Sequence, residues 1–410
     1  MTPTHLNKRR VLAVAAAGAA GAAAAYYVYK RWNWAPDEDK PSSSGAQWSG
    51  GDTLVNPRGS AATLQKDAEA HLQHHFDSIQ DIADNTTIPS LLPALAAALN
   101  RAADVDSLLE KLRQSKDAGN GGAAQQPGQQ APLTGEQKVA LWEELSIAAF
   151  TRAVGSLWLL PLLDLFVRVQ LNILGRHLYL ESALDSSSRK TGGPGAAAGG
   201  AGAAPPTLPR LSAPSQEQFL SYAEYLSREG AGALLGLVQS AVSSALRGVA
   251  LAAPLDCDGL GRLLSDMLAG LTTSARAAGW DTFLLPPPAA LAESLLAVRP
   301  DNRALAPQSH ALLVDREAVE GMLAEVRRVV RSDRFHEALV ACVRELSHDA
   351  VRKLCDRLAD QPLPLAKLVP AVAAAGQDYL TPGAPFVSQL ARMLEVHTLC
   401  ATVYSCGPPL

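Results

Sequence analysis

Cysteine, aromatic residues and strand-forming patterns are all scarce in this chain of 410 residues. The five cysteines are odd in number, and none of them occurs in the first 256 residues. This distribution argues against a disulfide framework and is typical of a reducing compartment. Aromatic residues make up 5% of the chain, and β-branched residues rarely alternate with polar ones. The sequence therefore offers little material for a β-sheet.

The sequence also lacks the motifs of common catalytic and nucleotide-binding sites. It contains no His-Glu-x-x-His, Cys-x-x-Cys or Gly-x-Ser-x-Gly, and its net charge of −4 comes without a basic, aromatic-rich stretch. The glycine-rich run at 192–202 has no Gly-Lys-Ser/Thr to hold a phosphate. We therefore expect no enzyme, no metal or other cofactor, no small-molecule substrate and no nucleic-acid partner.

Three groups of chemically active side chains have simple structural interpretations. Ser347, His348 and Asp349 are adjacent on a predicted helix, where successive side chains diverge by about 100° and cannot form a catalytic relay. The histidines near His75 share a helix face with no cysteine beside them, so a solvated surface is favoured over a metal site. Cys355 lies among basic residues and is interpreted as a partly buried core cysteine.

What the sequence does contain is helix-forming apolar residues. Hydrophobic residues make up 48% of the chain, and alanine and leucine supply most of them. Both lose little side-chain entropy in a helix. The length is sufficient for one large buried core. We predict an all-α protein, with one N-terminal transmembrane helix followed by a single elongated helical-bundle domain that carries disordered inserts.

The predicted membrane anchor occupies residues 1–35. Its segment 11–29 is uncharged, and basic residues precede and follow it. A helix of this length rises about 28 Å, close to the roughly 30 Å thickness of the hydrocarbon layer. Tyrosines and tryptophans cluster between positions 26 and 34, as at a membrane interface. We expect a transmembrane helix at about 11–29.

Two other interpretations of this segment stay open. The alanines at 22–25 resemble the small residues of a signal-peptide cleavage site, and a cleaved organelle-targeting peptide is the other alternative. Targeting peptides are usually amphipathic, whereas this segment is uniformly apolar. Because both ends are basic, the positive-inside rule says little about orientation and slightly favours a cytosolic N-terminus.

Composition divides the rest of the chain. Residues 36–59 are rich in serine, glycine, proline and aspartate and are predicted to be a flexible linker, and 60–410 form the helical domain. Two low-complexity loops, about 115–132 and 186–214, are predicted to be disordered. The predicted helices are 61–82, 90–99, 105–113, 134–184, 216–251, 256–278, 315–331, 332–359, a short one after Lys367, and 386–404. Asp104 or Asp106 is expected to cap the third, and Thr134 the fourth.

A second apolar stretch, 153–167, is interpreted as a buried central helix. Pro161 lies inside it, and the uncharged part between Arg152 and Asp164 is too short to cross a bilayer. Asp164 and Arg168 are four residues apart, so their side chains share a helix face and are expected to pair.

An apolar stripe at the start of that long helix is the strongest candidate for a binding site. Lys138, Leu141, Trp142, Leu145 and Ala149 recur at helical spacing. Trp142 either packs in the core or forms the wall of a groove that accepts an amphipathic helix.

Several runs of residues form a recognisable set: 88–95 (IPSLLPAL), 141–145 (LWEEL), 150–152 (FTR), 168–175 (RVQLNILG), 179–180 (YL) and 364–370 (PLAKLVP). With the short apolar N-terminal segment, they resemble the signature of the peroxin-3 family. The run 168–175 is the most specific. The resemblance covers most of the chain outside the three predicted disordered segments. Arg176, at a place where the family often has a small residue, and the long insert 186–214 depart from the pattern.

The resemblance implies a peroxisomal membrane protein, single-pass, with the bulk of its chain in the cytosol. Its partners would be membrane lipid and peroxin 19, the soluble receptor that delivers newly made peroxisomal membrane proteins. An amphipathic helix of peroxin 19 would enter an apolar groove. The implied groove residues are Trp142, Lys138, Leu145, Leu109, Asn172 and Leu178. The alternative function is an organelle tether that links a membrane to cytosolic partners.

Overall fold

The computed structural model describes residues 57–120, 133–191, 211–297, 307–358 and 361–405. The predicted membrane anchor, all but the last three residues of the predicted linker, and much of the two predicted loops lie outside these ranges.

The described chain is almost entirely helical, as the composition predicted. Its helices are α2 (Pro57–Ile82), the π-turn η1 (Ala83–Thr87), α3 (Ile88–Ala102), α4 (Val105–Asn120), α5 (Gly135–Thr191), α6 (Ala213–Ser221), η2 (Tyr222–Glu224), η3 (Leu226–Gly230), α7 (Ala231–Leu246), α8 (Cys257–Ala278), α9 (Asp281–Leu284), α10 (Pro288–Ala297), α11 (Pro307–Val330), α12 (Asp333–Leu358), α13 (Leu365–Asp378), α14 (Phe386–Ala391) and α15 (Leu394–Ser405). The two-residue strands β1 (Pro254–Leu255) and β2 (Leu363–Pro364) pair antiparallel.

Helix α5 is the axis of the molecule. It has 57 residues, which corresponds to about 86 Å. Helices α3, α7, α12, α13 and α15 pack directly on it. Among the described residues it is the one helix long and apolar enough to cross a membrane, and its apolar window is fully buried inside the protein. This confirms the interpretation of 153–167 as part of a buried central helix.

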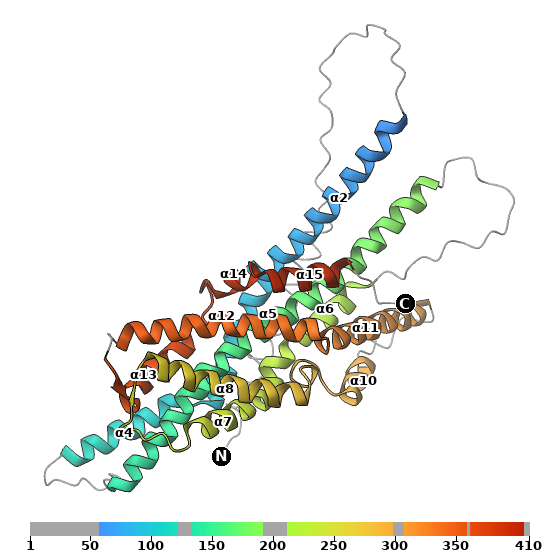
Figure 1. The fold of residues 1–410 in the computed structure, drawn as a ribbon. Helices are drawn as coiled ribbons and strands as arrows, with labels where there is room; N and C mark the ends of the chain where they lie inside the picture. Colours follow the sequence, from blue (N-terminus) through green and yellow to red (C-terminus); the bar gives the residue numbers. More distant parts are fainter. Residues whose placement is uncertain (1–56, 121–132, 192–210, 298–306, 359–360, 406–410) are drawn as a thin grey trace, which may run out of the picture.

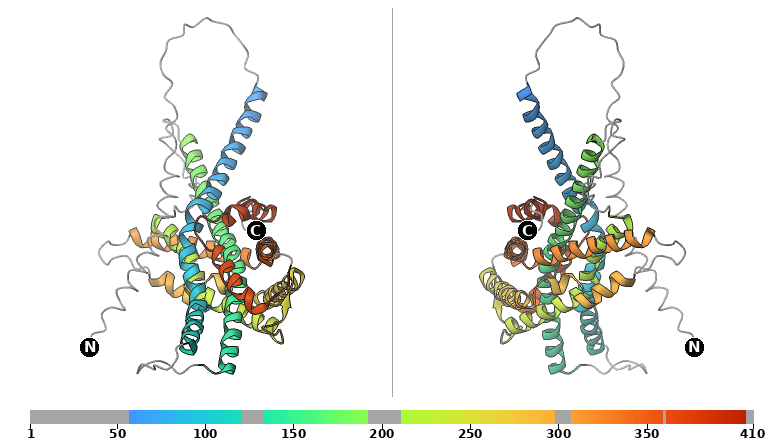
Figure 2. Two further views of the ribbon diagram at one scale, coloured as in Figure 1. Left: turned by 90° about the vertical axis from the view of Figure 1, so that its left-hand side faces the viewer. Right: turned by 90° about the vertical axis from the view of Figure 1, so that its right-hand side faces the viewer.

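The other helices surround α5 in two directions. Helices α2 and α3 run along it, whereas α7, α8, α11 and α12 cross it (Figures 1 and 2). One crossing is very close, because a Cβ atom added to Gly376 of α13 would lie 2.8 Å from the backbone nitrogen of Ala153. The result is the elongated helical bundle that was predicted.

Helices α2 and α3 form one continuous rod, although the sequence predicted a break near Pro89. The π-turn η1 joins them, and the backbone N–H of Ile88 donates to the carbonyl of Ala83, five residues back. Pro89 then falls in the first turn of α3, where a helix tolerates the missing N–H. A proline at this position redirects the hydrogen bonds without ending the helix.

Two helices extend into segments predicted to be loops. Helix α4 continues to Asn120 rather than 113, and α5 continues to Thr191 rather than 184. No glycine or proline occurs between 184 and Gly192, so nothing in that stretch breaks the helix. In the other direction, the predicted helix 216–251 is divided among α6, η2, η3 and α7, and the predicted helix 386–404 is divided between α14 and α15.

The cysteines differ from expectation at one place. Cys257, at the start of α8, and Cys355, near the end of α12, form a disulfide, with their Cα atoms 5.5 Å apart. The scarcity of cysteine had favoured reduced thiols throughout. Cys342 and Cys400 are free and buried. The disulfide and the β1–β2 pair both connect the chain at the start of α8 with the chain at the end of α12.

A buried polar network holds α2 and η1 against the middle of α5. The Arg168 guanidinium donates to both carboxylate oxygens of Asp164, at 2.9 and 3.0 Å, which confirms the predicted pair. It also pairs with Asp84 of η1 and donates to Gln80 of α2 at 3.3 Å. Arg168 and Asp164 are at most 1% exposed. A buried charge of this kind requires such partners.

Candidate partner-binding surface at the α4–α5 end

The end of α4 and the start of α5 form one tip of the molecule, at the lower left of Figure 1. Residue types at the helix starts explain why the chain folds this way. The Asp104 carboxylate accepts the backbone N–H of Ser107 at 3.0 Å and caps α4. Thr134 and Gln137 exchange two bonds, of 2.9 and 3.3 Å, between side chain and backbone. This reciprocal pair is a capping box, which satisfies two free N–H groups at the start of α5.

A buried arginine fixes α4 against α5. Arg152 donates to the carbonyl of Ala103 at 2.9 Å, just after α3 ends, and to the Asp106 carboxylate at 3.3 Å. Its side chain is 2% exposed, whereas that of Asp106 is 74% exposed. The arginine therefore ties the start of α4 to α5 and sets which residues of the two helices meet.

Apolar side chains continue from that contact toward the tip. Leu109 and Leu112 follow Asp106 on α4, and Leu141 and Trp142 lie on α5; all four are partly buried and pack on the edge of the core. Val139, one turn from the start of α5, is 52% exposed. Two neighbouring helices thus present incompletely covered apolar side chains at one end of the bundle, where an apolar partner surface would gain burial.

Four of the six predicted site residues belong to this end. Trp142, Leu109 and Lys138 are partly exposed, so each is accessible to a partner. Leu145 is 0% exposed and lies in the core, where it supports the surface from below. Lys138 lies one turn before Trp142, whereas Glu143 and Glu144 are exposed on another side of α5. We refer to Leu109, Leu112, Lys138, Leu141 and Trp142 as the Trp142 surface.

The structure does not bring Asn172 and Leu178 to the Trp142 surface. They follow Trp142 by 30 and 36 residues on one unbroken helix, which places them about 45 and 54 Å away along the axis. Asn172 is fully buried. Its amide donates to the carbonyl of Arg168 at 2.7 Å, and its oxygen accepts from Gln80 at 3.1 Å. Asn172 is therefore part of the Arg168 network and not of a groove containing Trp142.

Sequence reasoning missed Leu112. It lies three residues after Leu109, and this spacing on a helix was the signal that could have found it. The predicted helix ended at residue 113, which put Leu112 in its last turn, beside a predicted loop. In the structure α4 continues for two more turns.

The fold and this surface together define a class: an all-helical scaffold that presents an accessible tryptophan at one end of its central helix. The family model described as Peroxin-3 matches residues 117–406. The chain belongs to the peroxin-3 family.

Relatives by sequence agree with this membership. Peroxisome biogenesis protein 3-1 of Arabidopsis thaliana is 34% identical over 182 residues, which are 44% of this chain and 43% of the relative. Peroxisomal biogenesis factor 3 of Homo sapiens is 26% identical over 359 residues, which are 82% of this chain and 84% of the relative. The factor of the same name in Cricetulus longicaudatus has the same identity and coverage. The match to the Arabidopsis relative thus spans less than half of that protein.

Proposed function

We propose that this chain is a docking protein of the peroxisomal membrane that recruits cargo-loaded peroxin 19 for peroxisome biogenesis. Family membership and the names of the relatives, peroxisome biogenesis factors, support the peroxisomal role. In this proposal the chain acts by binding and not by catalysis. Residues 11–29 anchor it as a single-pass protein, and the helical domain faces the cytosol.

The observation that carries the docking role is the accessibility of Trp142 beside apolar residues of two helices. An amphipathic helix presents apolar side chains at intervals of three and four residues, which suits a surface made by α4 and α5. Tryptophans in such positions are frequent anchors of binding energy. Lys138 would pair with an acidic residue at the edge of the partner helix. Asn172 and Leu178 are not part of the proposed docking surface.

The docking role is tested by the affinity of the full chain, in lipid nanodiscs, for a peptide from the N-terminal region of peroxin 19. We expect Trp142→Ala to weaken binding about 30-fold, the equivalent of about 2 kcal/mol. Leu394→Ala is the control, because Leu394 is 75% exposed and lies on α15, away from the tip. Unchanged affinity for Trp142→Ala would rule out this surface as the docking site.

The orientation is tested separately in cells. A fluorescent protein fused to the C-terminus should co-localise with peroxisomes, and protease added to intact organelles should digest it. Protection of the fused protein would place the helical domain inside the organelle and contradict the proposed topology, whatever the outcome of the peptide experiment.

A further inference from the structure

A hollow lies between α8 and α12, away from the Trp142 surface. It has a volume of about 690 Å³ and is lined by residues of α8 and α12, with Trp158 of α5 as the single contribution of the central helix. Small ligands occupy pockets of roughly 300–1,000 Å³. Trp158 follows Trp142 by 16 residues on α5, about 24 Å along the axis. The hollow is therefore a separate site.

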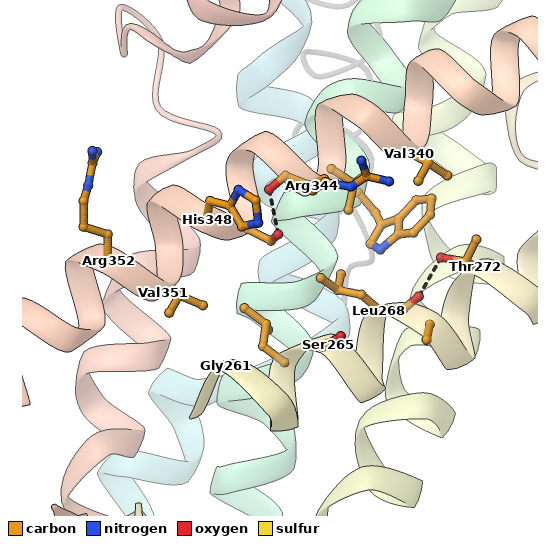
Figure 3. Close-up of a pocket in the computed structure, with 14 residues that line it drawn as sticks. Gly261, Ser265, Leu268, Thr272, Val340, Arg344, His348, Val351 and Arg352 are labelled. Atoms are coloured by element: carbon orange, nitrogen blue, oxygen red, sulfur yellow. Dashed lines mark hydrogen bonds between the residues drawn. The ribbon is translucent and has the colours of Figure 1, made fainter. Parts of the chain in front are cut away.

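Small side chains on α8 leave this space open. Gly261, Ser265, Ala269 and Thr272 follow one another along the side of α8 that lines the hollow. Larger apolar residues supply much of the rest of the lining, namely Leu264, Leu268, Val340, Val343 and Val351. The space is thus a largely apolar cleft between two helices, and Figure 3 shows the side chains that line it.

The charged side chains at this cleft are arginines, and its other polar groups are the hydroxyls of Ser265, Thr272 and Ser347 and the His348 imidazole. Arg344 and His348 lie on successive turns of α12 and are exposed, and no acidic side chain is among the residues that line the cleft. Arg344 forms no ion pair with another described residue. Arg352 also borders the cleft, but it is paired with Asp349 at 2.6 Å. Figure 3 shows the guanidinium of Arg344 over the cleft, whereas Arg352 extends away from it.

Trp158 adds a buried donor to the same cleft. Its side chain is 0% exposed, and its Nε1–H has no acceptor among the described residues. The ring is held in place by stacking on Trp280, with the ring centroids 5.3 Å apart. A buried N–H without an acceptor is unfavourable, so a ligand that supplies an oxygen here gains a hydrogen bond that the protein alone does not make.

We propose that the α8–α12 cleft binds a single-chain amphiphile with an anionic head, such as a fatty-acid carboxylate or an alkyl phosphate. The alkyl chain lies along the apolar lining, where its burial is favourable. The head accepts hydrogen bonds from Arg344 and Trp158, and His348 lies at the same mouth. The unpaired guanidinium and the absence of lining carboxylates select an anion over a cation. The cleft fits one alkyl chain rather than a bilayer surface.

Calorimetric titration of the full chain in nanodiscs of neutral lipid tests this proposal. The probes are dodecanoate and dodecyl phosphate, each below its micelle concentration, and dodecanol below its solubility limit. We expect both anions to bind, and dodecanol to bind at least 10-fold more weakly. Vesicles of phosphatidylglycerol form a further arm. Absence of anion binding, equal binding of dodecanol, or binding of the vesicles alone would each overturn the proposal.

Two variants locate the site. Arg344→Glu should weaken both anions at least 10-fold and leave dodecanol unchanged, and Ser265→Leu should fill the cleft and abolish binding of all three probes. The matched controls are Arg357→Glu on α12 and Ser274→Leu on α8, which are exposed positions outside the cleft. Thermal unfolding identifies variants that do not fold, and Ala269→Leu then replaces Ser265→Leu. Anion binding that survives both cleft variants would contradict the assignment.

Discussion

The start and the middle of helix α5 are built on opposite chemistry. At the Trp142 end, apolar side chains from two helices stay partly exposed, and the polar contacts serve to hold α4 in place. Around the middle of the helix, Arg168, Asp164 and Asn172 are buried and hydrogen-bonded to one another or to α2 and η1. A partner that buries the partly exposed apolar side chains gains free energy, whereas the hydrogen bonds of the buried network are already made within the chain. Function and fold stability are therefore expected to respond to different mutations on one helix.

The largest effect is expected from Arg168→Met. This change leaves the carboxylate of Asp164 buried without its partner, which typically costs about 3–5 kcal/mol of stability. Urea unfolding measures the loss. Arg352→Met is the control, because Arg352 is 73% exposed in its ion pair with Asp349, and such surface pairs contribute about 0–1 kcal/mol. A loss below 1 kcal/mol for Arg168→Met would show that the network is not what holds α2 and η1 to α5.

Asn172→Ala should show most clearly that the two regions differ, because it should affect stability and not peptide binding. It removes hydrogen bonds to Gln80 and to the backbone carbonyl of Arg168, and groups left unsatisfied in the interior cost about 1–3 kcal/mol. Stability should fall by that amount, and the affinity of the folded variant for a peroxin 19 peptide should not change. A peptide affinity that falls as much as with Trp142→Ala would show that Asn172 belongs to the docking site.

A smaller effect is expected from Lys138→Gln at the Trp142 end. Lys138 is partly exposed, so its pairing with an acidic residue of a bound helix is worth about 0.2–1 kcal/mol and is screened by salt. The peptide affinity should fall by a factor of about 1.5–5 at low ionic strength. The difference from the unmodified chain should vanish in 1 M salt. A difference that persists there would mean that Lys138 acts by packing rather than by charge.

A different kind of effect, a pH dependence of stability, is expected at the end of α5 near α2. His75 is partly buried, and its ring accepts or donates one hydrogen bond with the Tyr404 hydroxyl at 2.7 Å. Burial, followed by the charges of His71 and His74, lowers the pKa of His75 from 6.5 to about 4. Because the unfolded chain binds this proton more readily, stability should be full above pH 6.5 and decline as the pH falls toward 4.

His75→Phe tests this, because it should reduce the slope of stability against pH between 6.5 and 4, measured by urea unfolding. His348→Phe is the control, since His348 is exposed on α12 and is not among the groups that lower the pKa of His75. Equal slopes for His75→Phe and the unmodified chain would contradict the assignment.

The sequence was most informative where a structure depends on close neighbours along the chain. The pair of Asp164 and Arg168 followed from a spacing of four residues, and the caps at Asp104 and Thr134 followed from residue type. The burial of the central helix followed from charges that interrupt its apolar run.

Contacts between distant segments were not predictable in this way. Asn172 was grouped with Trp142 because the family resemblance placed both in the groove, whereas in the structure Asn172 is hydrogen-bonded to Gln80, 92 residues away in the chain. The α8–α12 cleft likewise depends on how two helices about 80 residues apart in the sequence pack on α5. No local pattern states which residues of such helices will meet. The Cys257–Cys355 disulfide is another contact between distant segments, because its two cysteines are 98 residues apart in the chain.

The lengths of the helices have a mechanical consequence. From Trp142 to the level of Tyr179, which contacts His75 of α2, is about 55 Å along α5. Helix α2 continues from His75 to Pro57, a further 27 Å or so. Measured along these two helices, Trp142 thus lies roughly 80 Å from the point where the chain continues into residues 1–56. If that N-terminal segment lies in a membrane, a receptor bound at Trp142 would be held in the cytosol at a distance from the bilayer. Its cargo would then have to move from there to the bilayer.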